Sequence, residues 1–196
     1  MSKLVKKMKY YSTPKYEVNQ KASYKISRSK IELFMQCPRC FWLDARLKIS
    51  RPSGPKFSIN NAIDGLMKND FDHYRQLAQP HPIMTLNNLE VIPMSHPKLN
   101  VWRNPFKGIS YLHPATNLTI YGGIDDLWIH PNDQVYIVDY KATAKDREVN
   151  IDSGWQISYK RQVEIYQWLF ANNGFNVSSK AFFVLNLSSS LNSVWP

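Results

Sequence analysis

The chain has 196 residues, of which 43% are hydrophobic and 13% aromatic, and this composition excludes a disordered protein. Its formal net charge is +10, and its length suits one domain that buries roughly 70% of its unfolded surface. The longest apolar stretch, around residues 181–185, is far shorter than the roughly 20 residues of a membrane-spanning helix. Residues 1–8 contain lysines but no apolar segment, so no secretory signal is expected, and the protein is predicted to be cytoplasmic.

The basic charge is concentrated at the N-terminus. Residues 1–31 contain nine lysines and arginines against one acid, Glu17, whereas the rest of the chain is nearly neutral. Tyrosines lie among these lysines at positions 10, 11, 16 and 24, a combination that suits a polyanion because lysines contact phosphates and aromatic rings stack on bases. A solvated tail explains the same pattern equally well. Residues 1–24 are therefore predicted to form a basic, flexible arm, and residues 25–196 a single domain.

Two helices are predicted in the first 80 residues. Ser29 can cap a helix that runs through Phe41 and ends at the loop of residues 50–55. A second helix is expected over roughly residues 59–77. Its apolar residues fall on one stripe at helical spacing: Ile63, Leu66, Met67, Phe71 and Tyr74.

Residues 80–114 are rich in proline, with short strands expected at 89–92 and 107–112. Four of the five histidines directly precede a proline: His81, His96, His113 and His130. A residue before proline is pushed out of the helical region, so these histidines are expected in turns or at strand ends. Because no two of them have the spacing of metal ligands on a helix, no histidine metal site is predicted.

A β-hairpin is the clearest pattern in the sequence. Two strand-like runs, Leu118–His130 and Gln134–Tyr140, are joined by the turn Pro131-Asn132-Asp133. The last expected elements are a helix over Ser153–Asn172, ended by Asn173-Gly174, and a strand over Ala181–Leu185. This order of elements predicts an α/β fold.

The loop length of the hairpin determines which side chains face one another. A three-residue loop places His130 opposite Gln134, and the same register places Asp125 opposite Asp139. Partners across a ladder have Cβ atoms roughly 5 Å apart, and the period of two puts Lys141 on the same face as Asp139. A change of one residue in the loop would instead bring Asp126 towards Asp139.

Two ionised carboxylates at this separation repel by roughly 3 kcal/mol at an effective dielectric of 20, so a cation is expected between them. Lys141 supplies one positive charge, and an oxygen-rich pair with an open side is also what Mg²⁺ selects. Such an ion can lower the pKa of a bound water and orient a phosphate, while the adjacent lysine positions the attacking water. The alternative is a surface hairpin with solvated acids, although Asp139 follows the apolar run of residues 135–138 and strands are depleted in aspartate.

Four segments carry motifs in an order known from one family. Gly122-Gly123-Ile124-Asp125 is a GxxD motif, and Asp139-Tyr140-Lys141 is a DYK motif. Gln162 and Tyr166 have the spacing of a QxxxY motif, one helical turn apart on a shared face. Upstream, the segment Ser27-Arg28-Ser29 is followed by a motif that begins with Cys37-Pro38 and ends at Phe41. Over about residues 25–186, the chain therefore resembles the PD-(D/E)xK nucleases, in particular their RecB-like branch.

The resemblance implies a restriction-endonuclease-like core, in which a central mixed β-sheet is flanked by helices. It further implies that Asp125 and Asp139 bind a divalent metal, Mg²⁺ or Mn²⁺, and that the carbonyl of Tyr140 completes the metal shell. Lys141 would act on the nucleophilic water. Gln162 and Tyr166 would steady the site or contact DNA.

Two positions depart from the pattern of the RecB-like branch. The branch usually has a histidine ligand on the helix before the sheet, where this chain has Asp64, which is a candidate third metal ligand or an ordinary polar residue of an amphipathic helix. Some relatives bind a [4Fe-4S] cluster through one early and three late cysteines. No cysteine follows Cys40, so no complete cluster is expected. Cys37 and Cys40 could form half a zinc site, but buried structural thiols in a reducing compartment are favoured.

The predicted function is metal-dependent hydrolysis of DNA phosphodiester bonds in repair, recombination or defence. The expected partner is DNA, single- or double-stranded, without a membrane, and a helicase or another component of a nuclease complex is considered. The alternative is a nucleic-acid-binding module that retains the fold without cutting. A metal-dependent RNase ranks lower because the expected general acid and base are missing. The chain ends soon after the last expected strand, which leaves open a shortened member of the family or a fragment.

Overall fold

The computed structural model describes residues 14–52, 58–143, 157–187 and 190–195. The helices are α1 Arg28–Gln36, α2 Pro38–Trp42, α3 Ser58–Leu77, α4 Pro82–Leu86, α5 Leu99–Trp102 and α6 Ile157–Asn172, with a π-helical segment, η1, at Leu43–Leu47. The strands are β1 Tyr24–Ser27, β2 Ile92–Pro93, β3 Ile109–His113, β4 Leu118–Gly122, β5 Asp126–Ile129, β6 Val135–Thr143, β7 Val177–Leu187 and β8 Ser190–Trp195. The predicted α/β class is confirmed.

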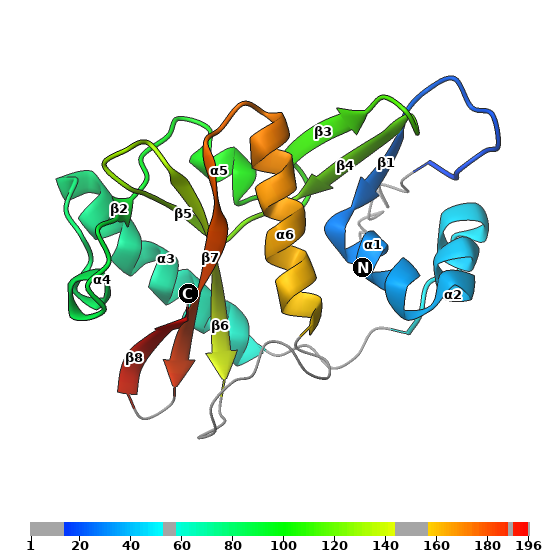
Figure 1. Cartoon of the computed structure of the whole chain (residues 1–196). Helices are drawn as coiled ribbons and strands as arrows, with labels where there is room; N and C mark the ends of the chain where they lie inside the picture. The colour runs from blue at the N-terminus through cyan, green and yellow to red at the C-terminus, as the bar shows by residue number, and fades with distance from the viewer. Residues whose placement is uncertain (1–13, 53–57, 144–156, 188–189, 196) are drawn as a thin grey trace, which may run out of the picture.

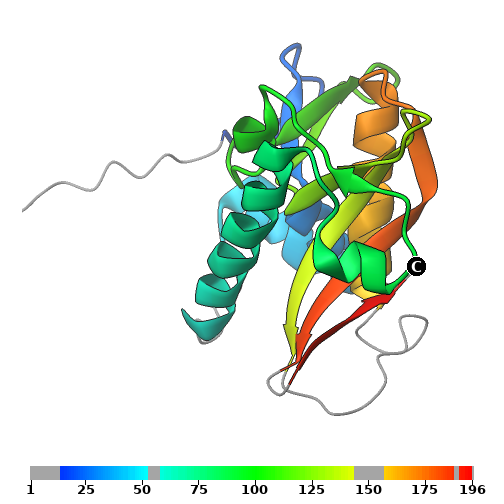
Figure 2. The same ribbon diagram turned by 90° about the vertical axis from the view of Figure 1, so that its left-hand side faces the viewer.

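The strands form two mixed sheets flanked by helices. The larger sheet has the order β2-β5-β6-β7-β8, in which only β6 and β7 run parallel. The smaller sheet has the order β1-β4-β3, with β1 parallel to β4. Helix α6 contacts strands of both sheets, and Figure 1 shows it lying across them. Figure 2 shows α3 on the opposite side of the larger sheet.

The side chains of the larger sheet alternate between two cores. Ile137, Leu127 and Phe183 pack in one core with the buried face of α6. Val138, Trp128 and neighbouring apolar side chains pack in the other with Met67 and Phe71 of α3. Because successive residues of a strand point to opposite faces, odd-numbered residues of β5 and β6 face α6 and even-numbered residues face α3. Asp139 and Lys141 therefore continue the row of Ile137.

The first run of the predicted hairpin is not one strand. It breaks after Gly122, and its two parts, β4 and β5, belong to different sheets. At the break, a Cβ on Gly122 would lie 2.5 Å from Cε1 of Tyr166, and a Cβ on Gly123 would lie 3.0 Å from Cα of Pro105. The two glycines allow the chain to cross between the sheets in close contact with α6 and the loop after α5.

Gly122→Ala is expected to lower the free energy of unfolding by about 1–3 kcal/mol, because the new methyl group must displace the buried ring of Tyr166. Gly65→Ala is the matched control. No atom lies within 4 Å of a Cβ at Gly65, and alanine in a helix interior should raise stability by about 0.5–1 kcal/mol. Urea unfolding of both variants checks the opposite signs, and equal effects would contradict the prediction.

The predicted first helix is wrong in its cap and in its continuity. Ser27, and not Ser29, is the N-cap, and its hydroxyl accepts a hydrogen bond from the backbone N–H of Lys30 at 3.3 Å. The helix ends at Gln36, because Cys37, the residue before Pro38, is extended, and α2 begins with that proline. Cys37 and Cys40 form a disulfide bond, so the expectation of two free thiols is also wrong.

Residues 14–24, which the sequence assigns to the arm, run beside η1. The N–H of Tyr16 donates to the carbonyl of Ala45 at 3.0 Å, and Nζ of Lys48 donates to the carbonyl of Pro14 at 2.7 Å. Tyr16 also packs edge-on against Tyr24. Contacts with the body of the protein therefore begin at Pro14, eleven residues before the predicted start of the domain at residue 25, and the rest of the arm, residues 1–13, lies outside the described residues.

The predicted second helix is confirmed as α3. Met67 and Phe71 of the predicted stripe are buried against the larger sheet. The placement of Leu66 on that stripe is wrong: it is 68% exposed, because consecutive residues of a helix point in different directions and Met67 takes the buried one. Helices α4 and α5 and strands β1 and β8 were not predicted. In the described part of the chain, no helix combines the length and apolar character of a membrane span.

Candidate active site

The register of the hairpin is confirmed. Strands β5 and β6 pair antiparallel with Asp126 opposite Val138, and the N–H of His130 donates to the carbonyl of Gln134 at 3.0 Å. One residue further, the ladder brings Asp125 towards Asp139. Oδ2 of Asp125 accepts a hydrogen bond of 3.0 Å from the backbone N–H of Tyr140, so Asp125 is held at the end of the hairpin on the predicted strand pair.

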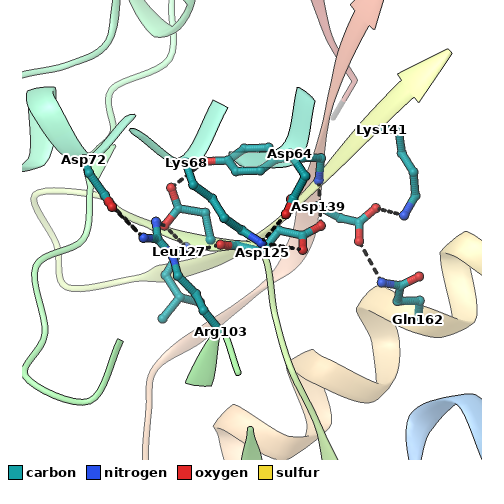
Figure 3. Close-up of polar contacts among 11 residues, drawn as sticks. Asp64, Lys68, Asp72, Arg103, Asp125, Leu127, Asp139, Lys141 and Gln162 are labelled. Carbon is teal, nitrogen blue, oxygen red and sulfur yellow. Dashed lines mark hydrogen bonds and ion pairs between the residues drawn. The ribbon is translucent and has the colours of Figure 1, made fainter. Parts of the chain in front are cut away.

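Asp139 is the buried acid of this site, with 1% of its surface exposed. Nε2 of Gln162, from α6, donates to its Oδ1 at 2.7 Å, and Nζ of Lys141 forms an ion pair with its Oδ2 (Figure 3). Burial raises the pKa of the Asp139 carboxyl above its usual range; the Lys141 ammonium opposes this shift, and the neighbouring Asp125 carboxylate adds to it. The two acids therefore interact directly, as the register predicts.

Oδ2 of Asp139 receives no hydrogen bond of acceptable geometry, although Lys141 contacts it. A buried carboxylate oxygen without hydrogen bonds is costly unless a cation approaches it. Lys141 itself is held on a second side, because its ammonium lies 4.4 Å from the centre of the Tyr159 ring. The site thus has an oxygen that can accept a further positive charge and a lysine fixed beside it.

The expected third acid, Asp64, approaches the pair through a lysine. Nζ of Lys68 lies 2.8 Å from Oδ2 of Asp64 and 3.5 Å from Oδ1 of Asp125. Both acids are partly exposed, with 38% and 24% of their side-chain surfaces accessible. Over the described ranges, no three acidic, histidine or cysteine side chains converge as a ready metal-binding group. A cation of the protein itself occupies the place between Asp64 and Asp125.

The two residues of the QxxxY motif have different surroundings. Gln162 bonds directly to Asp139, as described above. Tyr166 is buried against Gly122, and burial raises the pKa of its hydroxyl, an effect that a hydrogen bond and the charge of Arg28 oppose. The charges of Asp139 and Asp125 also raise the pKa of Tyr166, so its hydroxyl lies near the acid pair as well as near Arg28. Gln162 contacts the pair directly, and Tyr166 lies between the pair and the start of α1.

A buried polar network behind the site was not predicted. Asp126 is fully buried on the α3 face, where it accepts hydrogen bonds from the Tyr140 hydroxyl at 2.6 Å and from Nη2 of Arg103 at 2.9 Å, and pairs with Arg75. Nε of Arg103 also donates to the carbonyl of Asp125 at 3.0 Å, and its Nη1 binds both oxygens of Asp72. The sequence did contain a signal for this network, namely two successive aspartates, Asp125 and Asp126, at the start of a buried strand. Because successive residues of a strand point to opposite faces, one of the two must lie on the α3 face and find partners there.

The network fixes both strands of the hairpin at the acid pair. Arg103 holds the main chain of Asp125, while Asp126 holds the ring of Tyr140, whose N–H binds the Asp125 carboxylate. The side chains that face α6 are thus positioned by groups on the opposite face of the sheet. The carbonyl of Tyr140 as a metal ligand remains a prediction.

No protein-family model matches the chain, and searches of curated proteins and of solved structures find no match. The likeness to the PD-(D/E)xK nucleases accordingly rests on the four motifs and their order. Of these motifs, GxxD, DYK and QxxxY each bring at least one residue to the same end of the hairpin: Asp125, Asp139 and Gln162.

Proposed function

We propose that the protein is a Mg²⁺- or Mn²⁺-dependent nuclease of the RecB-like PD-(D/E)xK type, with a restriction-endonuclease-like core, that hydrolyses phosphodiester bonds in DNA. The observation that carries the proposal is the meeting of Asp125, Asp139 and Lys141 at one end of the hairpin, with the buried Asp139 close to both other charges. Stability alone gives no reason to place two acids together in a strand pair.

The donor set suits a hard divalent ion. Asp125 and Asp139 provide carboxylate oxygens, and Oδ2 of Asp139 is buried without a hydrogen bond of good geometry. Mg²⁺ takes one or two carboxylates and retains waters that substrate phosphates can replace. When bound, such an ion lowers the pKa of a coordinated water and offsets negative charge on the phosphate. The Tyr140 carbonyl and Asp64 are proposed as further ligands.

The chain's own residues have distinct proposed roles in hydrolysis. Asp125 and Asp139 would hold the divalent ion, which would supply positive charge for the reacting phosphate. Lys141 would hold the attacking water and stabilise the developing charge with its ammonium. As the water oxygen bonds to phosphorus, the bond from phosphorus to the leaving oxygen breaks; a proton of the water passes to solvent, the leaving oxygen takes a proton from solvent, and no covalent enzyme intermediate forms. Gln162 keeps Asp139 in place through its 2.7 Å hydrogen bond, and Tyr166 steadies α6 from the side of Arg28.

The proposed substrate is DNA, single- or double-stranded, and the proposed setting is repair, recombination or defence in the cytoplasm, with a helicase or other nuclease-complex component as a further partner. The net charge of +10 supports a polyanionic substrate, because lysines and arginines that contact phosphates release bound counterions.

Cleavage of end-labelled DNA tests the proposal. Wild-type protein should cut single-stranded or duplex DNA with Mg²⁺ or Mn²⁺, and EDTA should abolish the cutting, because phosphate hydrolysis at this site requires the divalent ion. Asp139→Ala should lose the cutting, and Asp133→Asn is its matched control, which should cut as wild type does. Asp133 lies in the exposed turn of the same hairpin at φ 63°, a conformation that asparagine accepts. Cutting that persists in EDTA, or no cutting by folded protein with either metal, would contradict the proposal.

A non-cutting nucleic-acid-binding module is the second candidate. The observation that favours it is Lys68, which already pairs with Asp64 and Asp125 and so reduces their need for a metal. In that case, folded wild-type protein would retain labelled DNA at moderate salt in EDTA and with either metal alike, without products.

A further inference from the structure

Lys68 is a cation within the acid cluster that has no role in the proposed reaction. It lies on α3, one turn after Asp64, and its ammonium reaches across to Asp125 in the link between β4 and β5 (Figure 3). Only 21% of its side-chain surface is exposed. Lysine side chains usually extend into water, so this position reflects attraction by the two carboxylates.

Both carboxylate oxygens of Asp125 are engaged. Oδ2 accepts the hydrogen bond of 3.0 Å from the N–H of Tyr140, and Oδ1 faces Nζ of Lys68 at 3.5 Å. A divalent ion on Oδ1 would lie within a few Å of this ammonium, and the two positive charges would repel each other. Coordination by Asp125 therefore requires Lys68 to move away or to give up part of its attraction to that acid.

We propose that Lys68 is a built-in competitor of the divalent ion, which neutralises Asp64 and Asp125 in the metal-free protein and lowers the metal affinity of the site. This inference rests on the proposed metal-dependent function. When Lys68 withdraws, Asp64 loses its ion-pair partner and becomes the third carboxylate of the site. The lysine thus sets both how strongly the ion binds and whether Asp64 takes part.

Titration of the protein with Mn²⁺ in the absence of DNA, followed by calorimetry and by the electron paramagnetic resonance of free Mn²⁺, tests this proposal. Lys68→Met should bind Mn²⁺ about tenfold more tightly than wild type, since a neighbouring charge of this kind shifts an ion equilibrium by at least that factor. Methionine keeps the length of the side chain and its helix propensity. Lys180→Met, which removes an equal charge from an exposed position of β7, should bind as wild type does.

A double variant separates the part played by Asp64. If Asp64 joins the site once Lys68 is gone, Asp64→Asn combined with Lys68→Met should lose most of the gain in affinity. Lys68→Gln, measured alongside, repeats the test with a polar side chain, and thermal unfolding with and without Mn²⁺ shows that each variant is folded.

The outcomes distinguish this inference from the proposed function. Unchanged or weaker Mn²⁺ binding by both Lys68 variants, with wild type binding normally, would overturn the role of Lys68 and leave the nuclease proposal in place. Absence of Mn²⁺ binding in the folded wild type and in both variants would overturn both. Tighter Mn²⁺ binding by both Lys68→Met and Lys68→Gln supports the role of Lys68 as a competitor of the divalent ion, whether or not the wild type cuts DNA.

Discussion

Asp126→Ala is expected to lower the free energy of unfolding by about 3–5 kcal/mol, because it leaves buried positive charge without its partner. The carboxylate is fully buried and pairs with the guanidinium groups of Arg75 and Arg103, whose side chains are only 8% and 9% exposed. Asp72 remains as their second acid, but it is 35% exposed and cannot replace a carboxylate inside the core. Urea unfolding followed by circular dichroism measures the effect.

Two comparisons make this result specific to the network. Asp126→Asn retains one acceptor oxygen and the shape of the side chain, so it should cost less than the alanine variant. Asp133→Asn, in the exposed turn of the same hairpin, should change stability by at most about 0.5 kcal/mol. A loss below about 1 kcal/mol in Asp126→Ala would show that the arginines do not depend on this carboxylate.

Lys141→Met is expected to reduce the single-turnover rate of DNA hydrolysis at saturating Mn²⁺ by about 10²- to 10³-fold. Its ammonium lies at Asp139 and over the Tyr159 ring, where it can stabilise charge that develops on the phosphate. Asp139→Ala should remove activity as well, but for a different reason, since it deletes a metal ligand. Quenched-flow assays on labelled DNA measure the rates.

Metal titration separates these two causes. Mn²⁺ affinity should fall strongly in Asp139→Ala, which loses a carboxylate oxygen. It should not fall in Lys141→Met, which keeps both carboxylates and loses a positive charge that repels the ion. If Lys141→Met cut DNA at the wild-type rate, the lysine would serve only to neutralise Asp139. Activity that survives in Asp139→Ala would point to a contaminating nuclease.

Local patterns predicted the central part of the fold. The three-residue turn and the period of two gave the register of β5 and β6, and with it the meeting of Asp125 and Asp139. This relation depends on one regular ladder, so it can be read without knowing how distant segments pack. The place of Gln162 at the acids was instead implied by the resemblance to the QxxxY motif.

Contacts between distant segments could not be predicted in this way. Lys68 reaches Asp125 across 57 positions of sequence, and Arg103 reaches Asp72 across 31. The switch of the chain from one sheet to the other at Gly122 depends on the closeness of Tyr166, which no local pattern contains. Helices α4 and α5, with five and four residues, are too short for a hydrophobic period to show.

The opposite orientation of Asp125 and Asp126 has a consequence for how such a protein can evolve. In the proposed nuclease, Asp125, Asp139 and Lys141 provide the chemistry, whereas the stability of the hairpin depends on Asp126 and its arginines on the other face. A change at Asp139 removes a proposed metal ligand but leaves Asp126 and its arginines in place, so a descendant that no longer cuts can keep this stabilising network. A change at Asp126 would remove fold and chemistry together, so selection should preserve Asp126 in cutting and non-cutting lineages alike.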